Sequence, residues 1–132
     1  CKFALTETTL GIPPAQIAPF VAQRIGLAKA RRIMLTAARF TGKEAFEMGL
    51  ADFIAKDAND LKNIESDIIK GVMNCAPGAN AITKEIVLAT RHLERSEMID
   101  FAAKGFAERM LSDEGREGIA SFIEKRKPKW SK

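Results

Sequence analysis

Residues 3–13 read Phe-Ala-Leu-Thr-Glu-Thr-Thr-Leu-Gly-Ile-Pro, and no other stretch says as much about the fold. Its β-favouring start predicts a short strand over Lys2–Leu5. The segment Gly11–Pro14 breaks any regular element, and Pro14 suits the first turn of a following helix, where its missing N–H costs nothing. Glu7 lies between the strand and the break. Taken alone, a Glu beside Thr residues is expected to cap or pair near the strand end.

Working outward from this stretch, the apolar spacing predicts helices from about Pro14 to Ile25 and from Leu27 to about Thr36. Pro19 lies inside the first helix and implies a kink or a break there. Thr41 and Glu44 have the spacing of a capping box, which predicts a short helix over Lys43–Met48. Gly49 is a suitable C-terminal stop. Residues 50–55 are expected to be extended.

The rest of the chain has the periodicity of amphipathic helices. Four are predicted, at about 58–75, 79–92, 96–111 and 113–126. Ser96 and Ser112 are each placed to cap a helix start, and Pro128 ends the last helix. Residues 1–57 are therefore mixed and residues 58–132 helical. Helices with one apolar stripe each must cover a preceding layer or another subunit.

Composition and charge bound the function. The chain is 46% hydrophobic and 29% charged, which is typical of an ordinary globular protein rather than a disordered one. Its net charge of +4 favours a partner bearing phosphates, although the basic tail over 124–129 is also read as a solvated end. Nucleic acid is disfavoured as that partner, because aromatic residues do not interleave with the basic ones.

The cysteines and the hydropathy exclude further classes. Cys1, Cys75 and His92 form no metal-ligand pattern, so no metal is expected. Free thiols indicate a reducing compartment, and we expect a cytoplasmic location. No apolar run approaches the roughly 20 residues that cross a bilayer. The chain opens at Cys1, directly in the predicted strand, which is expected of a processed, proteolysed or deliberately cut product.

Three stretches carry a resemblance to a known family. The first is the opening stretch, with Phe3, Glu7, Leu-Gly and Pro13 in the family's order. The second runs from Leu35 to Phe40 and on through Glu44-Ala45 and Gly49-Leu50-Ala51. The third holds Ser112-Asp113-Glu114, Glu117-Gly118-Ile119 and residues 122–128, Phe-Ile-Glu-Lys-Arg-Lys-Pro. Together they resemble the later part of the enoyl-CoA hydratase/isomerase (crotonase) superfamily, closest in character to methylglutaconyl- and isohexenylglutaconyl-CoA hydratases.

The resemblance implies a fold and a division of the chain. It makes this chain, mainly α by itself, the carboxy-terminal half of the α/β crotonase fold. Residues 1–57 would be the end of the ββα spiral core and carry the second catalytic Glu. Residues 58–132 would be a helical assembly domain that builds a homotrimer or hexamer. The amino-terminal half would then be a missing partner that supplies the first glutamate and the oxyanion hole.

It also implies the chemistry. Glu7 would shuttle the Cα proton during hydration of an α,β-unsaturated acyl-CoA, a reaction of fatty acid metabolism, and this fragment alone would be inactive. Ile12, Pro14 and Ile17 would contact the acyl group, because a Pro-rich turn replaces the family's Gly-rich one. Phe122 and Lys125 would face coenzyme A, with no cofactor beyond that moiety of the substrate.

Other readings stay open. The chain could be a non-catalytic crotonase-derived helical assembly module, or it could serve another reaction of the family such as enoyl-CoA isomerisation. The Pro-rich turn could be a neutral loop variant. Lys125 could be one solvated charge in a basic tail, and Trp130 could be a packing anchor or disordered.

Overall fold

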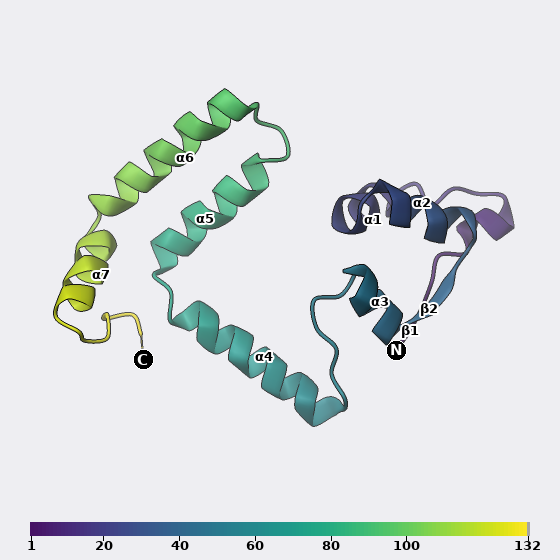
Figure 1. Cartoon of the computed structure of the whole chain (residues 1–132), viewed down its shortest axis with the longest axis horizontal. Coiled ribbons are helices and arrows are strands. Elements are labelled where there is room, and N and C mark those ends of the chain that lie inside the picture. Colours follow the sequence, from purple (N-terminus) through teal and green to yellow (C-terminus); the bar gives the residue numbers. More distant parts are fainter. Residues whose placement is uncertain (132) are drawn as a thin grey trace. The chain divides into compact units, whose positions relative to one another are not determined.

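The computed structural model describes residues 1–131, which form two compact units. The first unit is Cys1–Ile64 and the second begins at Glu65. The boundary falls inside helix α4, Ala58–Met73, whereas the predicted division after residue 57 falls just before this helix. Figure 1 traces the order of the elements along the chain.

The first unit is built on a two-stranded antiparallel ribbon. Strand β1, Lys2–Ala4, pairs with β2, Arg39–Thr41, so that Phe3 lies opposite Phe40. Their rings stack with centroids 5.4 Å apart, a favourable cross-strand aromatic contact. The predicted strand at Lys2–Leu5 is confirmed to within one residue. Strand β2 was not predicted, because three residues hold too little alternation to be read.

Helices complete this unit. The 3₁₀ helix η1, Glu7–Leu10, follows β1, and the α-helices are α1, Ala18–Ile25, α2, Leu27–Leu35, and α3, Gly42–Met48. A shared core lies between α1, α2, β2 and α3, and its buried members are Ile25, Ala30, Ile33, Met34, Phe40 and Ala45. Burial of such side chains is the main stabilising contribution of a small unit.

One of the predictions for this unit fails for a physical reason. The helix expected from Pro14 begins only at Ala18, because Pro19 is tolerated in the first turn but not further inside a helix. After the expected helix stop, Gly49 at φ 82°, residues 50–55 form neither a helix nor a strand.

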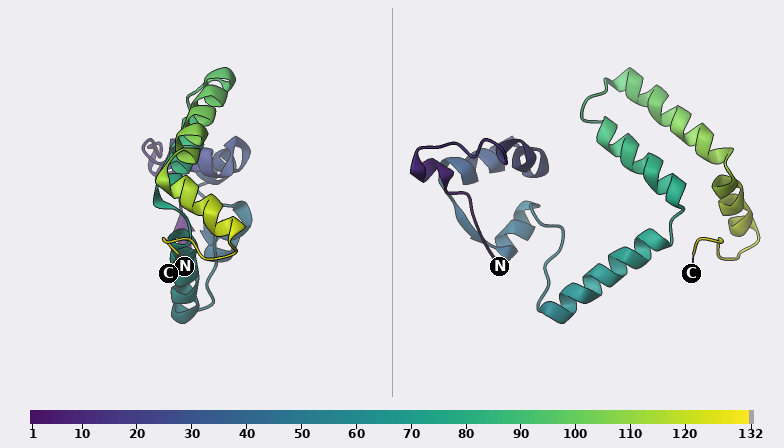
Figure 2. Two further views of the ribbon diagram at one scale, coloured as in Figure 1. Left: turned by 90° about the vertical axis from the view of Figure 1, so that its left-hand side faces the viewer. Right: turned by 180° about the vertical axis from the view of Figure 1, so that it is seen from behind.

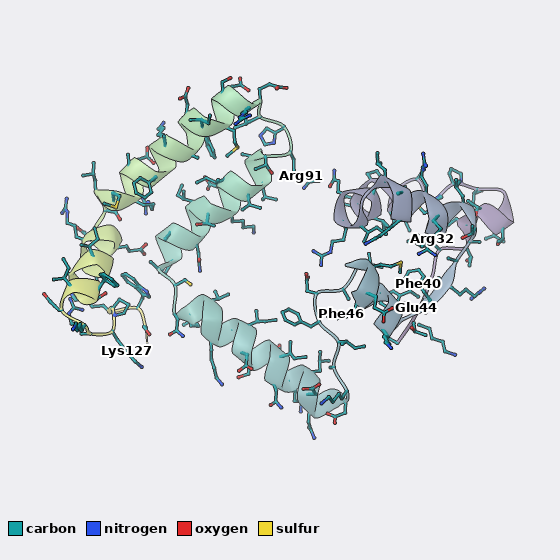
Figure 3. All side chains as sticks on the ribbon, in the orientation of Figure 1. Arg32, Phe40, Glu44, Phe46, Arg91 and Lys127 are labelled. Atoms are coloured by element: carbon teal, nitrogen blue, oxygen red, sulfur yellow. The ribbon has the colours of Figure 1, made fainter. Side chains whose placement is uncertain are left out.

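Side chains of α2 hold the end of α3. Lys29 Nζ donates to the Met48 carbonyl at 3.0 Å, which satisfies a carbonyl at the negative end of the helix. Arg32 reaches the Met48 sulfur at 3.7 Å, and Figure 3 shows Arg32 directed from α2 toward α3. At the start of α3, the predicted capping box is confirmed, with Thr41 Oγ1 accepting from the Glu44 N–H and Glu44 accepting from the Thr41 N–H.

The second unit is helical. It contains the later part of α4 and then α5, Pro77–Ala89, α6, Arg95–Met110, and α7, Asp113–Ile123. Helices α5 and α6 lie side by side in Figure 1 and in the right-hand view of Figure 2. Their contact is close where Gly105 meets Ile82, since a side chain at Gly105 would collide there. The described residues contain no helix that is long and apolar enough to cross a membrane.

The ends of these helices differ from the predicted ones. Helix α5 begins at Pro77, because proline fits the first helical position. Helix α6 is capped by Glu94 in a capping box with Glu97, so the predicted cap at Ser96 is wrong. Ser112 is confirmed as a cap, since its Oγ accepts from the Gly115 N–H at 3.1 Å.

The tail after α7 folds back onto the same unit. The indole N–H of Trp130 donates to the Asn74 carbonyl at 3.3 Å, and the ring packs over Gly118. Ser131 Oγ donates to Asn74 Oδ1 at 2.8 Å. Trp130 is therefore a packing anchor, as one of the two sequence readings held.

Candidate active site

Glu7 is the first residue of η1 and is separated from strand β1 by Leu5 and Thr6. The turn closes at Gly11, whose φ of 74° is a left-handed conformation that glycine adopts without strain. Backbone N–H groups of Gly11 and Ile12 donate to the carbonyls of Thr8 and Glu7, each at 3.3 Å. The sequence Leu-Gly after the Glu thus ends the turn that presents the carboxylate.

Two hydrogen bonds fasten this turn, one to the last turn of α2 and one to the residue before β2. The Leu5 N–H donates to the Ala38 carbonyl at 3.3 Å, and the Thr8 hydroxyl donates to the Met34 carbonyl at 3.0 Å. They lie on either side of Glu7 in the sequence. Sequence reasoning missed Thr8, and the only signal that could have found it is its place beside the Glu of the motif.

The Glu7 side chain has an unsatisfied acceptor. The residue is half-buried, and its Oε2 atom is shielded from solvent without a hydrogen-bond partner among residues 1–131. Such a group is uncommon in folded proteins, because an unpaired buried acceptor costs about 1–3 kcal/mol. A carboxylate that no internal donor uses is free to exchange a proton with a bound molecule. This makes Glu7 the best candidate for catalysis in the first unit.

The three predicted acyl-contacting residues follow Glu7 closely but are not enclosed. Ile12 is 54% exposed and Ile17 is 37% exposed, while Pro14 is half-buried. A hydrogen bond of 2.9 Å from the Ala18 N–H to the Pro14 carbonyl fixes the bend before α1. The segment presents apolar surface beside the turn that carries Glu7, and the structure does not gather it into a closed pocket.

Phe122 and Lys125 lie at the end of α7 in the second unit. Phe122 is 85% exposed, although aromatic side chains of this size are usually covered. Lys125 has a φ of 53°, in the left-handed region. The N–H groups of Lys125 and Arg126 donate to the carbonyls of Phe122 and Ser121, which is the Schellman pattern of a helix end. Lysine thus occupies the position where glycine is usual.

A network of ion pairs holds the residues after this turn. Arg126 pairs with Glu117 at 2.6 Å and with Glu124 at 2.5 Å, and the Glu117 carboxylate also accepts from the Lys129 N–H at 3.0 Å. The hydrogen bond from Arg126 and the N–H of Lys129 lower the pKa of Glu117 to about 2. The Arg126 guanidinium is therefore occupied by ion pairs within the second unit. The side chains of Lys125 and Lys127 are exposed, and Figure 3 marks Lys127 in this tail.

The comparisons with known proteins agree with this reading of the fold. The family model described as enoyl-CoA hydratase/isomerase matches residues 1–132. The chain therefore belongs to the enoyl-CoA hydratase/isomerase family, and its fold is the crotonase fold.

Individual relatives place the chain within that family. The structure of Pseudomonas aeruginosa AtuE is similar with a TM-score of 0.96 and 48% identity, covering 100% of this chain and 51% of that one. An enoyl-CoA hydratase/isomerase from Marinobacter aquaeolei gives 0.94 and 40%, covering 99% and 50%. A peroxisomal Delta(3,5)-Delta(2,4)-dienoyl-CoA isomerase of Arabidopsis thaliana is 31% identical, covering 82% and 39%. The chain thus spans about half the length of the two solved structures, and less of the isomerase.

Proposed function

We propose that this chain is the carboxy-terminal part of an enoyl-CoA hydratase, in which Glu7 exchanges a proton with Cα of the substrate. In hydration, the oxygen of water bonds to Cβ of the α,β-unsaturated thioester, the water gives up one proton to a base, and Cα gains a proton. Glu7 supplies the proton to Cα. The single observation that carries this role is the buried, unpaired Oε2 atom of Glu7 on a turn fastened at both sides.

The other groups that the reaction needs are proposed to lie outside this chain. They are a first glutamate that activates water and backbone N–H groups that stabilise the thioester oxygen. Residues 1–57 then complete the core of the active site. The acyl group that we favour is a branched glutaconyl group, whose contacts would include the apolar surface of Ile12, Pro14 and Ile17.

For coenzyme A, we propose contacts from Phe122 and Lys125. The backbone supports this role, because a lysine in a left-handed conformation is strained and glycine would hold the turn better. A helix end that keeps lysine there is explained if the ammonium group is needed beside a phosphate. The exposed ring of Phe122 offers a flat apolar face for the adenine.

Residues 58–132 are proposed to assemble the enzyme into a trimer or hexamer. Helix α6 carries the evidence. Its Gly105 meets Ile82 of α5, while its Ile99 and Phe106 are 61% and 67% exposed. Residues seven apart share one side of a helix, so these two side chains mark one apolar side of α6 that a second subunit could cover.

A test of the reaction uses Glu7→Gln in the active enzyme that contains this chain. The amide keeps the shape of the side chain but cannot exchange a proton. Proton transfer by a positioned side chain contributes about 10²–10⁴-fold, so kcat for hydration of an enoyl-CoA should fall by that factor, with KM little changed. Undiminished turnover in Glu7→Gln would contradict the assigned role.

A second candidate, enoyl-CoA isomerisation, is favoured by the Arabidopsis relative, whose name is that of an isomerase. Isomerisation also requires that a proton is moved at Cα, so Glu7 would serve either reaction. Product analysis separates them, since hydration gives a 3-hydroxyacyl thioester and isomerisation gives a shifted alkene of unchanged mass. No turnover in any form of the enzyme would instead favour a non-catalytic assembly module.

A further inference from the structure

We propose that Thr8 is a positioning residue for Glu7, a role that rests on the proposed function of Glu7. Thr8 follows Glu7 directly, and its Oγ1 donates to the Met34 carbonyl at 3.0 Å, joining residues 26 apart in the sequence. The bond ties the turn that carries the carboxylate to helix α2. Thr8 does not itself touch the reacting atoms in this role.

The receiving structure is the last turn of α2. There the Ala38 N–H donates to the Ile33 carbonyl at 2.9 Å, and the Ala37 N–H donates to the Met34 carbonyl at 3.4 Å. Ala37 closes the turn with a φ of 50°. These bonds follow the Schellman pattern, which fixes the direction of the final carbonyls.

One carbonyl of α2 and one just before β2 then hold the two sides of the catalytic turn. The Ala38 carbonyl accepts from the Leu5 N–H before Glu7, and the Met34 carbonyl accepts from the Thr8 hydroxyl after it. Ile33 and Met34 are both buried in the core of the first unit, so the platform is itself anchored. The packing of α2 thus determines how Glu7 is oriented.

This external support is needed because η1 is short. A 3₁₀ helix of four residues has poor hydrogen-bond geometry, and only weak internal bonds resist its rotation. The Glu7 Oε2 atom has no partner among the described residues that could orient it from the side-chain end. Without the Thr8 bond, the Leu5 bond is the one hydrogen bond that residues 1–131 provide between this segment and residues 34–38. A displacement of about 1 Å at a reacting group can cost about 10²-fold in rate.

Thr9 provides a matched control. It lies in the same turn and is exposed like Thr8, but its hydroxyl donates to the Thr6 carbonyl at 2.7 Å, within η1 and its cap. Replacing either threonine by valine removes one hydroxyl and keeps the branched shape. Only the change at Thr8 removes a bond to α2. Both positions are exposed, so neither change leaves a cavity in the core.

The experiment measures kcat, KM and melting temperature for Thr8→Val, Thr8→Ser and Thr9→Val in the active enzyme that contains this chain. We expect Thr8→Val to lower kcat by about 10- to 100-fold with KM within about twofold. Thr8→Ser, which keeps the hydroxyl, should recover kcat to within about threefold. Thr9→Val should match the wild type in kcat and KM.

Four results would overturn the positioning role. They are a wild-type kcat in Thr8→Val, a Thr8→Ser variant no better than Thr8→Val, an equal loss in Thr9→Val, and a loss of turnover that only follows the folded fraction. Glu7→Gln in the same series separates the two proposals. If that variant is inactive while Thr8→Val is normal, positioning fails alone. If it is fully active, the proposed function fails, and the role of Thr8 fails with it.

Discussion

Ala37 and Lys125 are the two non-glycine residues with positive φ in the described part of the chain. Each closes a helix, α2 and α7 respectively, at the position where glycine is the usual residue. A left-handed conformation costs an ordinary residue about 1–2 kcal/mol. The two residues therefore carry the same local strain in two places, which allows strain and side-chain function to be separated.

Replacing Lys125 by glycine should separate them. The change removes the strain, so the melting temperature should stay the same or rise by a few degrees, whereas the Kd for coenzyme A should rise by about 3- to 10-fold through loss of one charge contact. Isothermal titration with coenzyme A and thermal unfolding of the active enzyme measure the two effects. Ala37→Gly is the control, with the same relief of strain and an unchanged Kd. Equal Kd values in both variants would remove Lys125 from the coenzyme A site.

At the scale of the elements, Ser96 and Ser112 were predicted alike and turned out differently. Ser112 caps α7, but the cap of α6 is Glu94, in a box with Glu97, two residues before the predicted cap at Ser96. Glu94, Ser96 and Glu97 lie within four residues there. Local propensity does not decide which of these neighbouring residues caps the helix. The capping box at Thr41 was predictable because no second candidate competes with it.

The two serines give a paired prediction. Ser112→Ala should lower the free energy of unfolding by about 1 kcal/mol, because the Gly115 N–H loses its acceptor. Ser96→Ala should change it by less than about 0.5 kcal/mol, since alanine favours the helix and no cap is lost. Urea titration of both variants beside the wild type measures the difference. Two equal losses would show that α6 begins with Ser96 in solution.

For the molecule as a whole, the helical second unit leaves much apolar surface uncovered. We expect replacement of both Ile99 and Phe106 by serine to shift the protein from its assembled form toward monomer in sedimentation velocity. The physical reason is the loss of one apolar stripe on α6, which is open to solvent in the isolated chain.

The control for this prediction is Asp100→Ser, an exposed polar position on the same helix, which should leave the sedimentation coefficient unchanged. A double variant that assembles like the wild type would place the interface elsewhere. A wild-type protein that is already monomeric at micromolar concentration would contradict assembly through the second unit.

The family and the helical character of the later residues were predictable, because motifs and amphipathic periodicity are written along the chain. The environment of Glu7 was not. Its turn is held by Met34 and Ala38, about 30 residues away, through main-chain carbonyls that no side-chain pattern records. A break at Pro19 was visible in the sequence, but which side of the proline would be helical depended on packing against α2.

Trp130 is the only tryptophan in these 132 residues, and they contain no tyrosine. Its indole lies over Gly118 and donates to the Asn74 carbonyl. Tryptophan fluorescence of this chain therefore reports on one place, the contact of the tail with the second unit. Docking or release of the tail after Lys125 and Arg126 should therefore change the emission wavelength and the intensity of this fluorescence. The basic end of the chain carries its own optical reporter, without any dye attached.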